Sequence, residues 1–377
     1  MIKNMKAIII SCFDWYDQRL ELIYKYLKEK CEVLVYTSDY DHIKKKEITN
    51  KNENCIYIHV PQYKRNLSFK RIFSHISFSI NIKKILKEEK PDIIYALAPV
   101  NSLVYICAKY KNKKKCKLIC DIIDLWPESL PMGNNRFIVP YNIWRYLRNY
   151  ALRKSDIIIT ECYYYIDRLK IANKKNVYTV PLFKKINVND RKSVETHIAN
   201  LRINNDKKII KLGYVGSINN IIDIEAIKKV CIQLKNRYDI VWVKIIGDGE
   251  NKNAFINMLK QVGCEVDFYG KIFDEKEKIK ILGECDYGLN MMVDTVSVGL
   301  TIKSIDYLSY GLPLINNIKG DTWELVNTKK IGVNIQSENN DIEISNKKMH
   351  WNALNCFDNF FSEEVAQRLV SSIMDKL

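Results

Sequence analysis

The stretch DIIYALAPVNSLVYICAKYKNKKKCKLICDIID, residues 92–124, contains the pattern that decides the fold. Two apolar runs, DIIYALAP and KLICDIID, flank a segment that reads as a helix. Continuous apolar strands are typical of a parallel sheet, because helices cover both of its faces and every side chain of the strand is buried. The stretch therefore predicts one strand–helix–strand unit of such a sheet.

The same alternation of strands and helices runs along the whole chain. In the first half it places strands at KAIIIS, CEVLVYTSD, CIYIHV, DIIITEC and VYTVPLF, and in the second at IIKLGYVGS, VWVKIIGDG, VDFYG, YGLNMM, LPLINN and GVNI. A polar interval over residues 184–206 separates the halves and is interpreted as a linker. We predict an α/β protein with two doubly wound, Rossmann-like domains, residues 1–185 and 205–355, facing a cleft, and a final helix within 356–377.

Composition limits the compartment and the partners. The 377 residues carry a formal net charge of +16, which either favours anionic partners or reflects a general bias toward lysine. The 11 cysteines form no Cys-x-x-Cys pair and read as buried apolar residues in a reducing compartment. The apolar run at the N-terminus is too short for a signal peptide. No run approaches the roughly 20 apolar residues of a membrane span. We therefore expect a cytoplasmic protein.

A basic amphipathic segment, residues 63–90, leaves two interpretations open. It interleaves apolar side chains with lysine and arginine. Helices of this kind lie on anionic membrane surfaces, and they also cover sheets with a solvated basic face. Peripheral contact with the inner face of the cell membrane is thus one prediction of the sequence.

The most specific motif is VSVGLTIKSIDYLSYGLPLINN, residues 296–317. A turn at Gly299, Leu300 and Thr301 leads into a helix whose first turn carries Lys303, so backbone N–H groups and a full positive charge would meet an anion there. Asp306 follows one turn later and suits a ribose, since a carboxylate accepts hydrogen bonds from two vicinal hydroxyls. The alternative is a surface ion pair between Lys303 and Asp306.

Two glycine turns in the second half are weaker candidates. GYVGS places Gly216 and Ser217 after a strand, where glycine permits close approach of an anion or forms an ordinary turn. IIGDGENK places Gly247 and Gly249 after the next strand, but it lacks the third glycine of a dinucleotide fingerprint. It indicates a nucleotide contact or a tight turn.

The first half offers candidates for binding a second substrate. In CDIIDLWPESLP, Asp124, Trp126 and Glu128 would project beyond a strand, where two acids and an aromatic face suit a sugar, and one acid could act as general base. The alternative is an acidic first turn of a helix. In SCFDWYDQR, Asp14, Trp15 and Arg19 occupy the corresponding position after the first strand.

At GYVGS, IIGDGENK, FYGKI, GLTIKSIDYLSYGLPLI and DIIDLWPES the sequence resembles bacterial GT-B glycosyltransferases that assemble capsule and other surface polysaccharides. The resemblance implies that the C-terminal domain binds a nucleotide sugar, that the N-terminal domain binds the acceptor, and that the last helix crosses back to the N-terminal domain. Asp306 stands at the second glutamate of the family's Glu-x7-Glu motif, and Val298 replaces the first. The arginine that precedes the family's lysine is absent after GYVGS, and Lys271 or Arg19 would substitute for it.

The resemblance predicts transfer of a sugar from a nucleotide diphosphate sugar, UDP-linked, to a lipid-linked or saccharide acceptor, with retention of configuration. No cofactor or metal is expected, since cationic side chains and a helix N-terminus stabilise the leaving diphosphate. Lys303 and Asp124 are the catalytic candidates. The alternatives are a nucleotide-sugar epimerase of the same twin-domain fold, an NAD-dependent Rossmann enzyme, and a basic nucleic-acid-binding protein.

Overall fold

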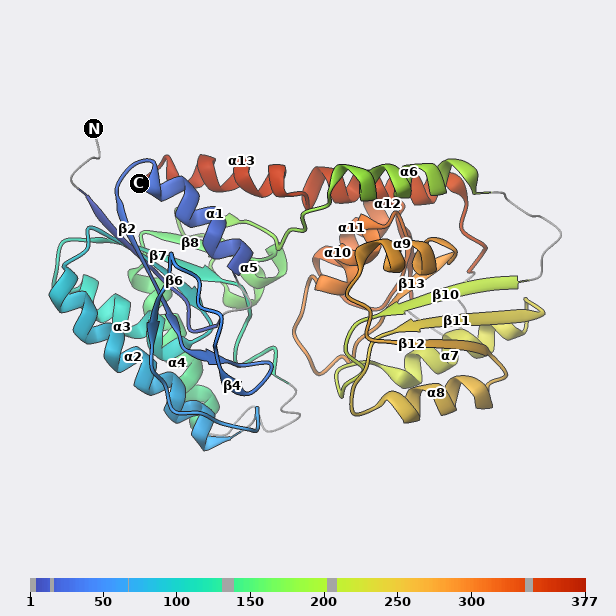
Figure 1. Cartoon of the computed structure of the whole chain (residues 1–377), viewed down its shortest axis with the longest axis horizontal. Coiled ribbons are helices and arrows are strands. Elements are labelled where there is room, and N and C mark those ends of the chain that lie inside the picture. Colours follow the sequence, from blue (N-terminus) through green and yellow to red (C-terminus); the bar gives the residue numbers. More distant parts are fainter. Residues whose placement is uncertain (1–4, 14–16, 67, 131–138, 202–208, 336–341) are drawn as a thin grey trace. The chain divides into compact units, whose positions relative to one another are not determined.

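The computed structural model describes residues 5–377 except 14–16, 67, 131–138, 202–208 and 336–341. Its contacts divide the chain into two units, Met1–Val180 with Gln367–Leu377, and Pro181–Ala366 (Figure 1). Each unit is a parallel sheet covered by helices on both faces. The predicted α/β class with two Rossmann-like domains is thus confirmed.

The first unit is built on seven parallel strands in the order β5-β2-β1-β6-β7-β8-β9. These are β1 (Lys6–Ile10), β2 (Glu32–Ser38), β5 (Ile56–Ile58), β6 (Ile93–Ala98), β7 (Lys117–Ile122), β8 (Ile157–Thr160) and β9 (Val177–Thr179). Every residue of β6 and β8 is buried, which explains why their sequences are apolar throughout. A two-stranded hairpin, β3 (Tyr40–Asp41) and β4 (Lys46–Glu47), lies after β2.

Helices of the first unit are α1 (Asp17–Lys28), α2 (Phe69–Glu89), α3 (Asn101–Lys111), α4 (Val139–Lys154) and α5 (Tyr163–Leu169). The side chain of Ser68 caps α2, accepting a hydrogen bond from the backbone N–H of Arg71. The unit also holds most of the last helix, α13 (Glu363–Met374), where Asp375 just beyond its end accepts hydrogen bonds from Lys30 and Tyr26. Among the described residues no helix combines the length and apolar character needed to cross a membrane.

The second unit has six parallel strands in the order β12-β11-β10-β13-β14-β15. These are β10 (Ile209–Val215), β11 (Ile240–Ile246), β12 (Glu265–Gly270), β13 (Tyr287–Asn290), β14 (Leu314–Asn316) and β15 (Gly332–Asn334). Between them run α7 (Ile224–Lys235), α8 (Lys252–Gln261), α9 (Glu275–Gly283), α10 (Ile302–Ser309) and α11 (Asp321–Lys329), and α12 (Lys347–Phe360) follows. The strand order reverses at β10, which pairs with β11 on one side and β13 on the other.

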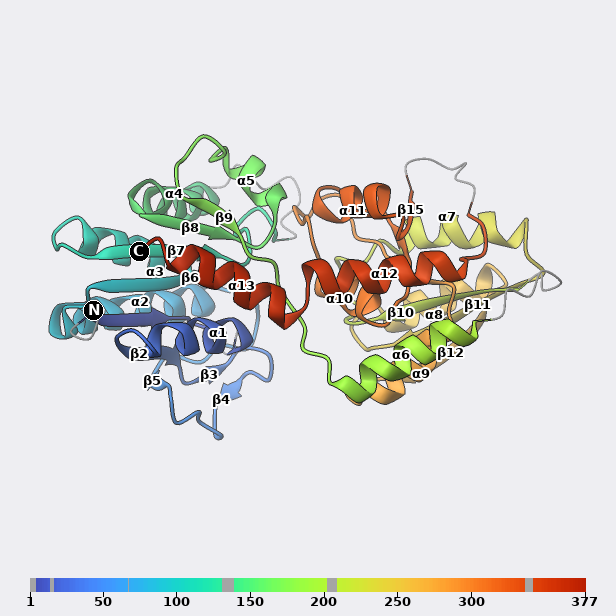
Figure 2. The ribbon, with the colours of Figure 1, turned by 90° about the horizontal axis from the view of Figure 1, so that it is seen from above.

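The interval 184–206, expected to be a linker, instead contains helix α6 (Val188–Asn200). The helix packs beside α9 and α12 in the second unit (Figure 2). Only three of its side chains are buried, Asp190, Val194 and Ile198, so its sequence shows too little apolar periodicity to reveal it. Asn187 caps its N-terminus by accepting from the backbone N–H of Asp190.

Candidate functional site

The reversal of strand order at β10 and β13 positions the candidate site. In open parallel sheets ligands bind outside the carboxyl ends of the strands at such a point. Asn290, the last residue of β13, is buried and accepts a hydrogen bond from the hydroxyl of Thr301 at 2.9 Å. The hydroxyl of Tyr307 accepts from the backbone N–H of Val215, the last residue of β10, at 2.9 Å. Helix α10 is therefore fixed with its N-terminus over this edge.

The start of α10 is a capping box. The hydroxyl of Thr301 accepts from the N–H of Ser304 at 3.0 Å, and the hydroxyl of Ser304 accepts from the N–H of Thr301 at 3.2 Å. The carbonyl of Gly299 accepts from the N–H and hydroxyl of Thr322, and Leu300 is buried. The N–H of Thr301 is therefore not free for an anion, and this part of the predicted nest is wrong. The first-turn N–H groups of Ile302 and Lys303, which no helix can satisfy internally, are what α10 offers an anion.

Lys303 is held at the edge of the sheet by an aromatic residue. Its Nζ donates to the hydroxyl of Tyr214 at 2.7 Å and lies 4.5 Å from the centroid of that ring. The Tyr214 hydroxyl in turn donates to the carbonyl of Ser217 at 2.7 Å. This chain of hydrogen bonds fixes the ammonium group beside the turn that follows β10.

The charge of Lys303 is balanced by no acid among the described residues. In the part of the chain that the structure describes, no carboxylate forms an ion pair with it. Burial lowers the pKa of Lys303 to about 8, because the charged form loses hydration without gaining a counter-ion. A partly buried cation of this kind favours an external anion, which would restore the missing charge balance.

Asp306 and Lys303 do not pair with each other, so the alternative of a surface ion pair is wrong. Asp306 Oδ1 instead accepts from Nζ of Lys184 at 2.8 Å. Lys184 also contacts Glu275 at 2.7 Å and donates to the hydroxyl of Tyr310 at 2.8 Å. The side chain of Asp306 is nonetheless 23% exposed, so a ligand hydroxyl can approach it.

The glycines of the second unit allow two turns to pack backbone against backbone. A Cβ on Gly247 would lie 1.9 Å from the carbonyl oxygen of Gly216, and one on Gly249 would lie 2.2 Å from that of Ile218. Gly216 and Gly247 also have φ of 119° and 151°, which other residues rarely adopt. Gly247 and Gly249 are thus required for the close packing of the two turns. Gly216 lies against Lys303, whose Cε would be 3.0 Å from a Cβ at Gly216.

Ser217 and Lys271 have exposed side chains, and both remain available to a ligand. Nζ of Lys271 lies 3.9 Å from Asp248, an exposed pair that contributes little to stability.

In the first unit, Asp124 is the centre of a local hydrogen-bond network. Its oxygens accept from the indole N–H of Trp126 at 2.7 Å and from the hydroxyl of Ser129. Burial raises the pKa of the Asp124 carboxyl, partly offset by these donors. A carboxylate with a raised pKa is suited to proton transfer, so Asp124 keeps its place as a candidate.

The expectation that Trp126 and Glu128 project beyond the strand is wrong. The Trp126 ring is only 5% exposed, with the guanidinium of Arg71 4.5 Å from its centroid. Glu128 forms two hydrogen bonds with the buried Arg148, at 2.5 and 2.9 Å. An aromatic ring whose face is already occupied cannot offer that face to a sugar. Both side chains therefore support the loop rather than contact a substrate in this state.

Arg19 is likewise committed within the unit. It is 2% exposed, and its Nε donates to Asp121 at 2.9 Å while its guanidinium also donates to the carbonyl of Val180. Arg19 thus forms a buried ion pair with Asp121. The expectation that its side chain is available to a substrate is wrong. Asp14 and Trp15 lie outside the described residues.

Sequence reasoning missed Tyr214, Lys184 and Arg71. Tyr214 sits inside the apolar strand β10, where its hydroxyl carries no periodic signal, and Lys184 lies 122 residues from Asp306. Pairings over such separations depend on the fold and not on local spacing.

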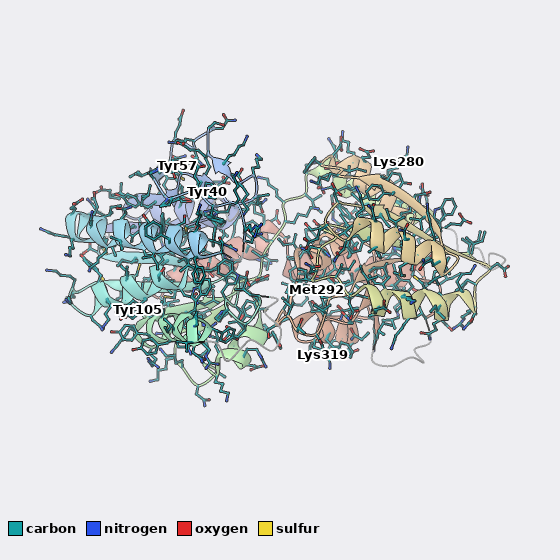
Figure 3. All side chains as sticks on the ribbon, turned by 90° about the horizontal axis from the view of Figure 1, so that it is seen from below. Tyr40, Tyr57, Tyr105, Lys280, Met292 and Lys319 are labelled. Atoms are coloured by element: carbon teal, nitrogen blue, oxygen red, sulfur yellow. The ribbon has the colours of Figure 1, made fainter. Side chains whose placement is uncertain are left out.

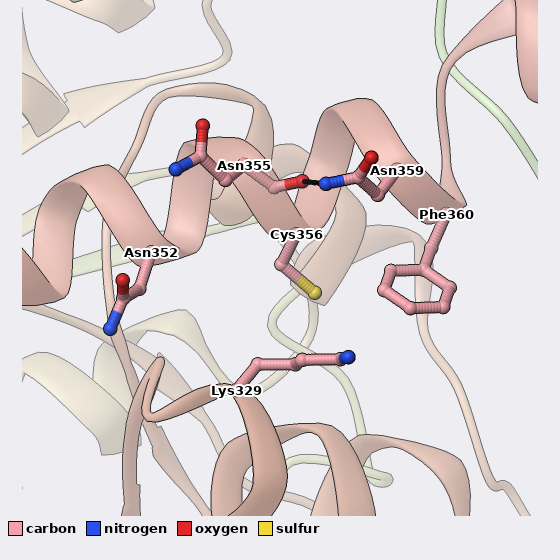
Figure 4. Close-up of a pocket in the computed structure, with 6 residues that line it drawn as sticks. All are labelled: Lys329, Asn352, Asn355, Cys356, Asn359 and Phe360. Carbon is pink, nitrogen blue, oxygen red and sulfur yellow. Dashed lines mark hydrogen bonds between the residues drawn. The ribbon is translucent and has the colours of Figure 1, made fainter.

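A surface hollow of the second unit lies away from all predicted residues. It is lined by Lys329 of α11 and by Asn352, Asn355, Cys356, Asn359 and Phe360 (Figure 4). Burial raises the pKa of the Cys356 thiol to about 12, so it is no nucleophile at neutral pH. The hollow therefore offers no group for chemistry, in contrast to the edge at Lys303.

Comparison with known proteins agrees with this geometry. Residues 19–181 match the family model described as Glycosyltransferase Family 4. A curated relative from Campylobacter jejuni subsp. jejuni serotype O:2, GalNAc-alpha-(1->4)-GalNAc-alpha-(1->3)-diNAcBac-PP-undecaprenol alpha-1,4-N-acetyl-D-galactosaminyltransferase, is 22% identical over 325 residues. The match covers 77% of this chain and 81% of the relative.

Solved structures share the fold over nearly their full lengths. Sucrose-phosphate synthase from Thermosynechococcus elongatus has a TM-score of 0.70 at 11% identity, with 99% of each chain covered. The lipopolysaccharide outer core galactosyltransferase WaaB gives 0.65 at 15% identity, covering 99% of this chain and 100% of that one. Anabaena Alr3699/HepE, solved with UDP-glucose, gives 0.63 at 14%, with the same coverage. The chain is a glycosyltransferase with the GT-B fold.

Proposed function

We propose that the chain transfers a sugar from a nucleoside-diphosphate sugar, UDP-linked, to a lipid-linked saccharide that is built into a bacterial surface polysaccharide. The observation that carries the donor half is Lys303, a partly buried cation at the switch point of the second sheet that pairs with no acid among the described residues. The acceptor half is supported by the Campylobacter relative, whose name specifies an undecaprenol-diphosphate-linked saccharide. UDP as the nucleotide is supported by the crystal structures of Anabaena Alr3699/HepE with UDP and with UDP-glucose.

The diphosphate would bind at the N-terminus of α10. Nζ of Lys303 would contact one phosphate, and the N–H groups of Ile302 and Lys303 would contact the same or the other phosphate. When the bond between sugar and diphosphate breaks, negative charge grows on the leaving oxygen. A lysine already fixed by Tyr214 stabilises that charge without reorganising, which is the main catalytic contribution we assign to it.

Asp306 would hold the ribose through the exposed part of its carboxylate. Lys184 orients that carboxylate, because its Nζ donates to Asp306 Oδ1 at 2.8 Å. On the acceptor side, Asp124 would receive a hydrogen bond from the reacting hydroxyl. The reaction needs no metal ion in this proposal and retains configuration at the transferred sugar.

Thermal unfolding with a panel of nucleotides tests the donor half. UDP should raise Tm above GDP, ADP and CMP, since binding to the folded state alone stabilises it. Incubation of UDP-sugars with lipid extract, read by mass spectrometry, then tests transfer, and EDTA should leave turnover unchanged. Absence of any Tm shift with the four nucleotides would exclude the proposal.

The same panel separates the competing functions. An epimerase would convert a UDP-sugar to its isomer without lipid extract. A nucleic-acid-binding protein would bind RNA or DNA with an affinity that falls steeply with salt and would show no nucleotide-specific Tm shift.

A further inference from the structure

Two helices of the first unit, α2 and α4, which both pack against α3, expose apolar side chains in stripes. On α2, Phe69, Phe73, Ile76 and Ile80 recur at helical spacing, and the two phenylalanines are 87% and 62% exposed. On α4, Val139, Ile143 and Tyr146 do the same. We refer to these seven side chains as the α2–α4 patch. Single exposed apolar residues are common on protein surfaces, but aligned stripes mark interaction surfaces.

The two stripes belong to one layer of the unit. Helix α3 packs against both α2 and α4, and the three helices cover the same face of the sheet. Figure 3 looks onto this face and labels Tyr105 of α3, which packs against Tyr150 of α4 with ring centroids 5.0 Å apart. Tyr146 continues this tyrosine cluster at 6.3 Å from Tyr150. Tyrosines of this kind favour the boundary between water and the apolar part of a membrane.

The charge around the patch is mainly positive. Residues 64–87 contain seven basic residues and no acidic one, Glu88 and Glu89 end α2, and residues 139–154 contain four basic residues and no acidic one. Exposed members include Lys70, Lys83, Lys84 and Lys87 on α2 and Arg145 on α4. A second copy of the chain would bring these like charges together, which disfavours self-association. An anionic surface instead complements them.

The patch lies at the end of the unit where a substrate would bind. Helix α2 leads from β5 to β6 and α4 leads from β7 to β8. Because both connections join parallel strands, the first turns of both helices lie at the carboxyl edge of the sheet. The stripes occupy these N-terminal halves, while the exposed lysines at 83, 84 and 87 follow toward the other end.

We infer that the α2–α4 patch docks the first unit on an anionic phospholipid bilayer, with Phe69, Phe73, Val139 and Ile143 in the headgroup region and the basic side chains on lipid phosphates. Docking there places the carboxyl edge of the first sheet next to the membrane. The inference rests on the proposed function in one respect, since it explains how a lipid-linked acceptor reaches the enzyme.

Sedimentation of the full chain with vesicles tests the inference. We expect binding to vesicles of phosphatidylglycerol with phosphatidylethanolamine, weaker binding at high salt, and little binding to phosphatidylcholine alone. Phe69→Ser with Phe73→Ser should reduce the partition coefficient about tenfold or more, because the apolar contribution is lost. Lys83→Glu with Lys84→Glu should reduce it by a similar factor on the anionic vesicles.

Matched controls lie on the second unit. Phe273→Ser removes a phenylalanine that is 84% exposed outside the patch, and Lys276→Glu with Lys280→Glu reverses two exposed lysines of α9. These controls should bind vesicles like the wild type, apart from a small effect of net charge. If they lose binding as strongly as the patch variants, the inference is overturned.

The UDP-induced Tm shift, measured without vesicles, should be unchanged in all of these variants. It separates loss of docking from misfolding and from failure of the proposed function. Equal binding to both vesicle types, or unchanged binding of the phenylalanine variants, would overturn the inference. So would analytical ultracentrifugation that shows a dimer in the wild type and a monomer in the Phe69→Ser, Phe73→Ser variant, with no vesicle binding by either.

Discussion

Replacing Lys303 by methionine should make the protein more stable and should weaken its binding of UDP. Methionine keeps the length and the apolar stem of lysine but removes the buried charge. The neighbouring hydroxyl of Tyr214 keeps its own hydrogen bond to the carbonyl of Ser217, so the change leaves no unsatisfied group behind.

The magnitude follows from the pKa of Lys303. Its value falls from 10.5 to about 8 in the folded protein. Since one pKa unit corresponds to about 1.4 kcal/mol, the partly buried charge lowers the free energy of unfolding by at most about 3 kcal/mol at neutral pH. The unfolded chain binds this proton more tightly than the folded one, so the loss is complete below pH 8, shrinks as the pH rises, and vanishes above about 10.5.

Urea denaturation of the wild type and Lys303→Met at pH 7 and pH 9.5 measures both effects. The variant should be more stable by up to about 3 kcal/mol at pH 7, with a smaller difference at pH 9.5. Its Tm shift with UDP should be smaller than that of the wild type at the same UDP concentration. A variant less stable than the wild type at pH 7 would refute the reasoning, because it would mean that the lysine is stabilised by its surroundings.

Three further predictions concern the site and its supports. UDP should bind about tenfold more weakly at pH 9 than at pH 7, because Lys303 must take up a proton to bind the anion, and calorimetry in buffers of different ionisation enthalpy should detect that proton. Gly247→Ala should cost several kcal/mol of stability, above about 3, since its Cβ meets the carbonyl of Gly216; thermal unfolding measures it. Glu128→Ala should cost about 3–5 kcal/mol by leaving Arg148 buried and unpaired, as urea denaturation would show.

Controls for these predictions are available in the same chain. Lys303→Met should remove the pH dependence of the residual UDP binding. Gly270→Ala has open space around its Cβ and tests the cost of positive φ alone. Glu21→Ala breaks an exposed pair with Lys25 and should change stability by less than about 1 kcal/mol. Should Glu128→Ala cost no more than Glu21→Ala, the supporting role of Glu128 is wrong.

The strands were predictable because burial on both faces leaves an unbroken apolar run. β6 and β8 are buried at every position, and the sequence shows them as such. Helix α6 could not be predicted, because only three of its side chains are buried. The spacing of its apolar residues does not distinguish it from a linker.

The position of Lys303 could be predicted because it depends on local features, a glycine turn followed by the first turn of a helix. What the sequence could not reveal is whether a polar side chain is already satisfied. Arg19 pairs with Asp121, which is 102 residues away in sequence, and Trp126 is covered by Arg71 of α2. Such pairings are set when the sheet assembles, so residue type and spacing predicted exposed side chains where the fold buries them.

The central claim is that Lys303 binds the diphosphate of the donor, and a comparison of two ligands on two proteins tests it directly. Calorimetric Kd values for UDP and for uridine should differ strongly in the wild type and far less in Lys303→Met, since the variant lacks the group that recognises the phosphates. The account predicts a coupling between this side chain and the diphosphate of about tenfold or more in Kd. If Lys303→Met binds UDP as tightly as the wild type does, the account is contradicted.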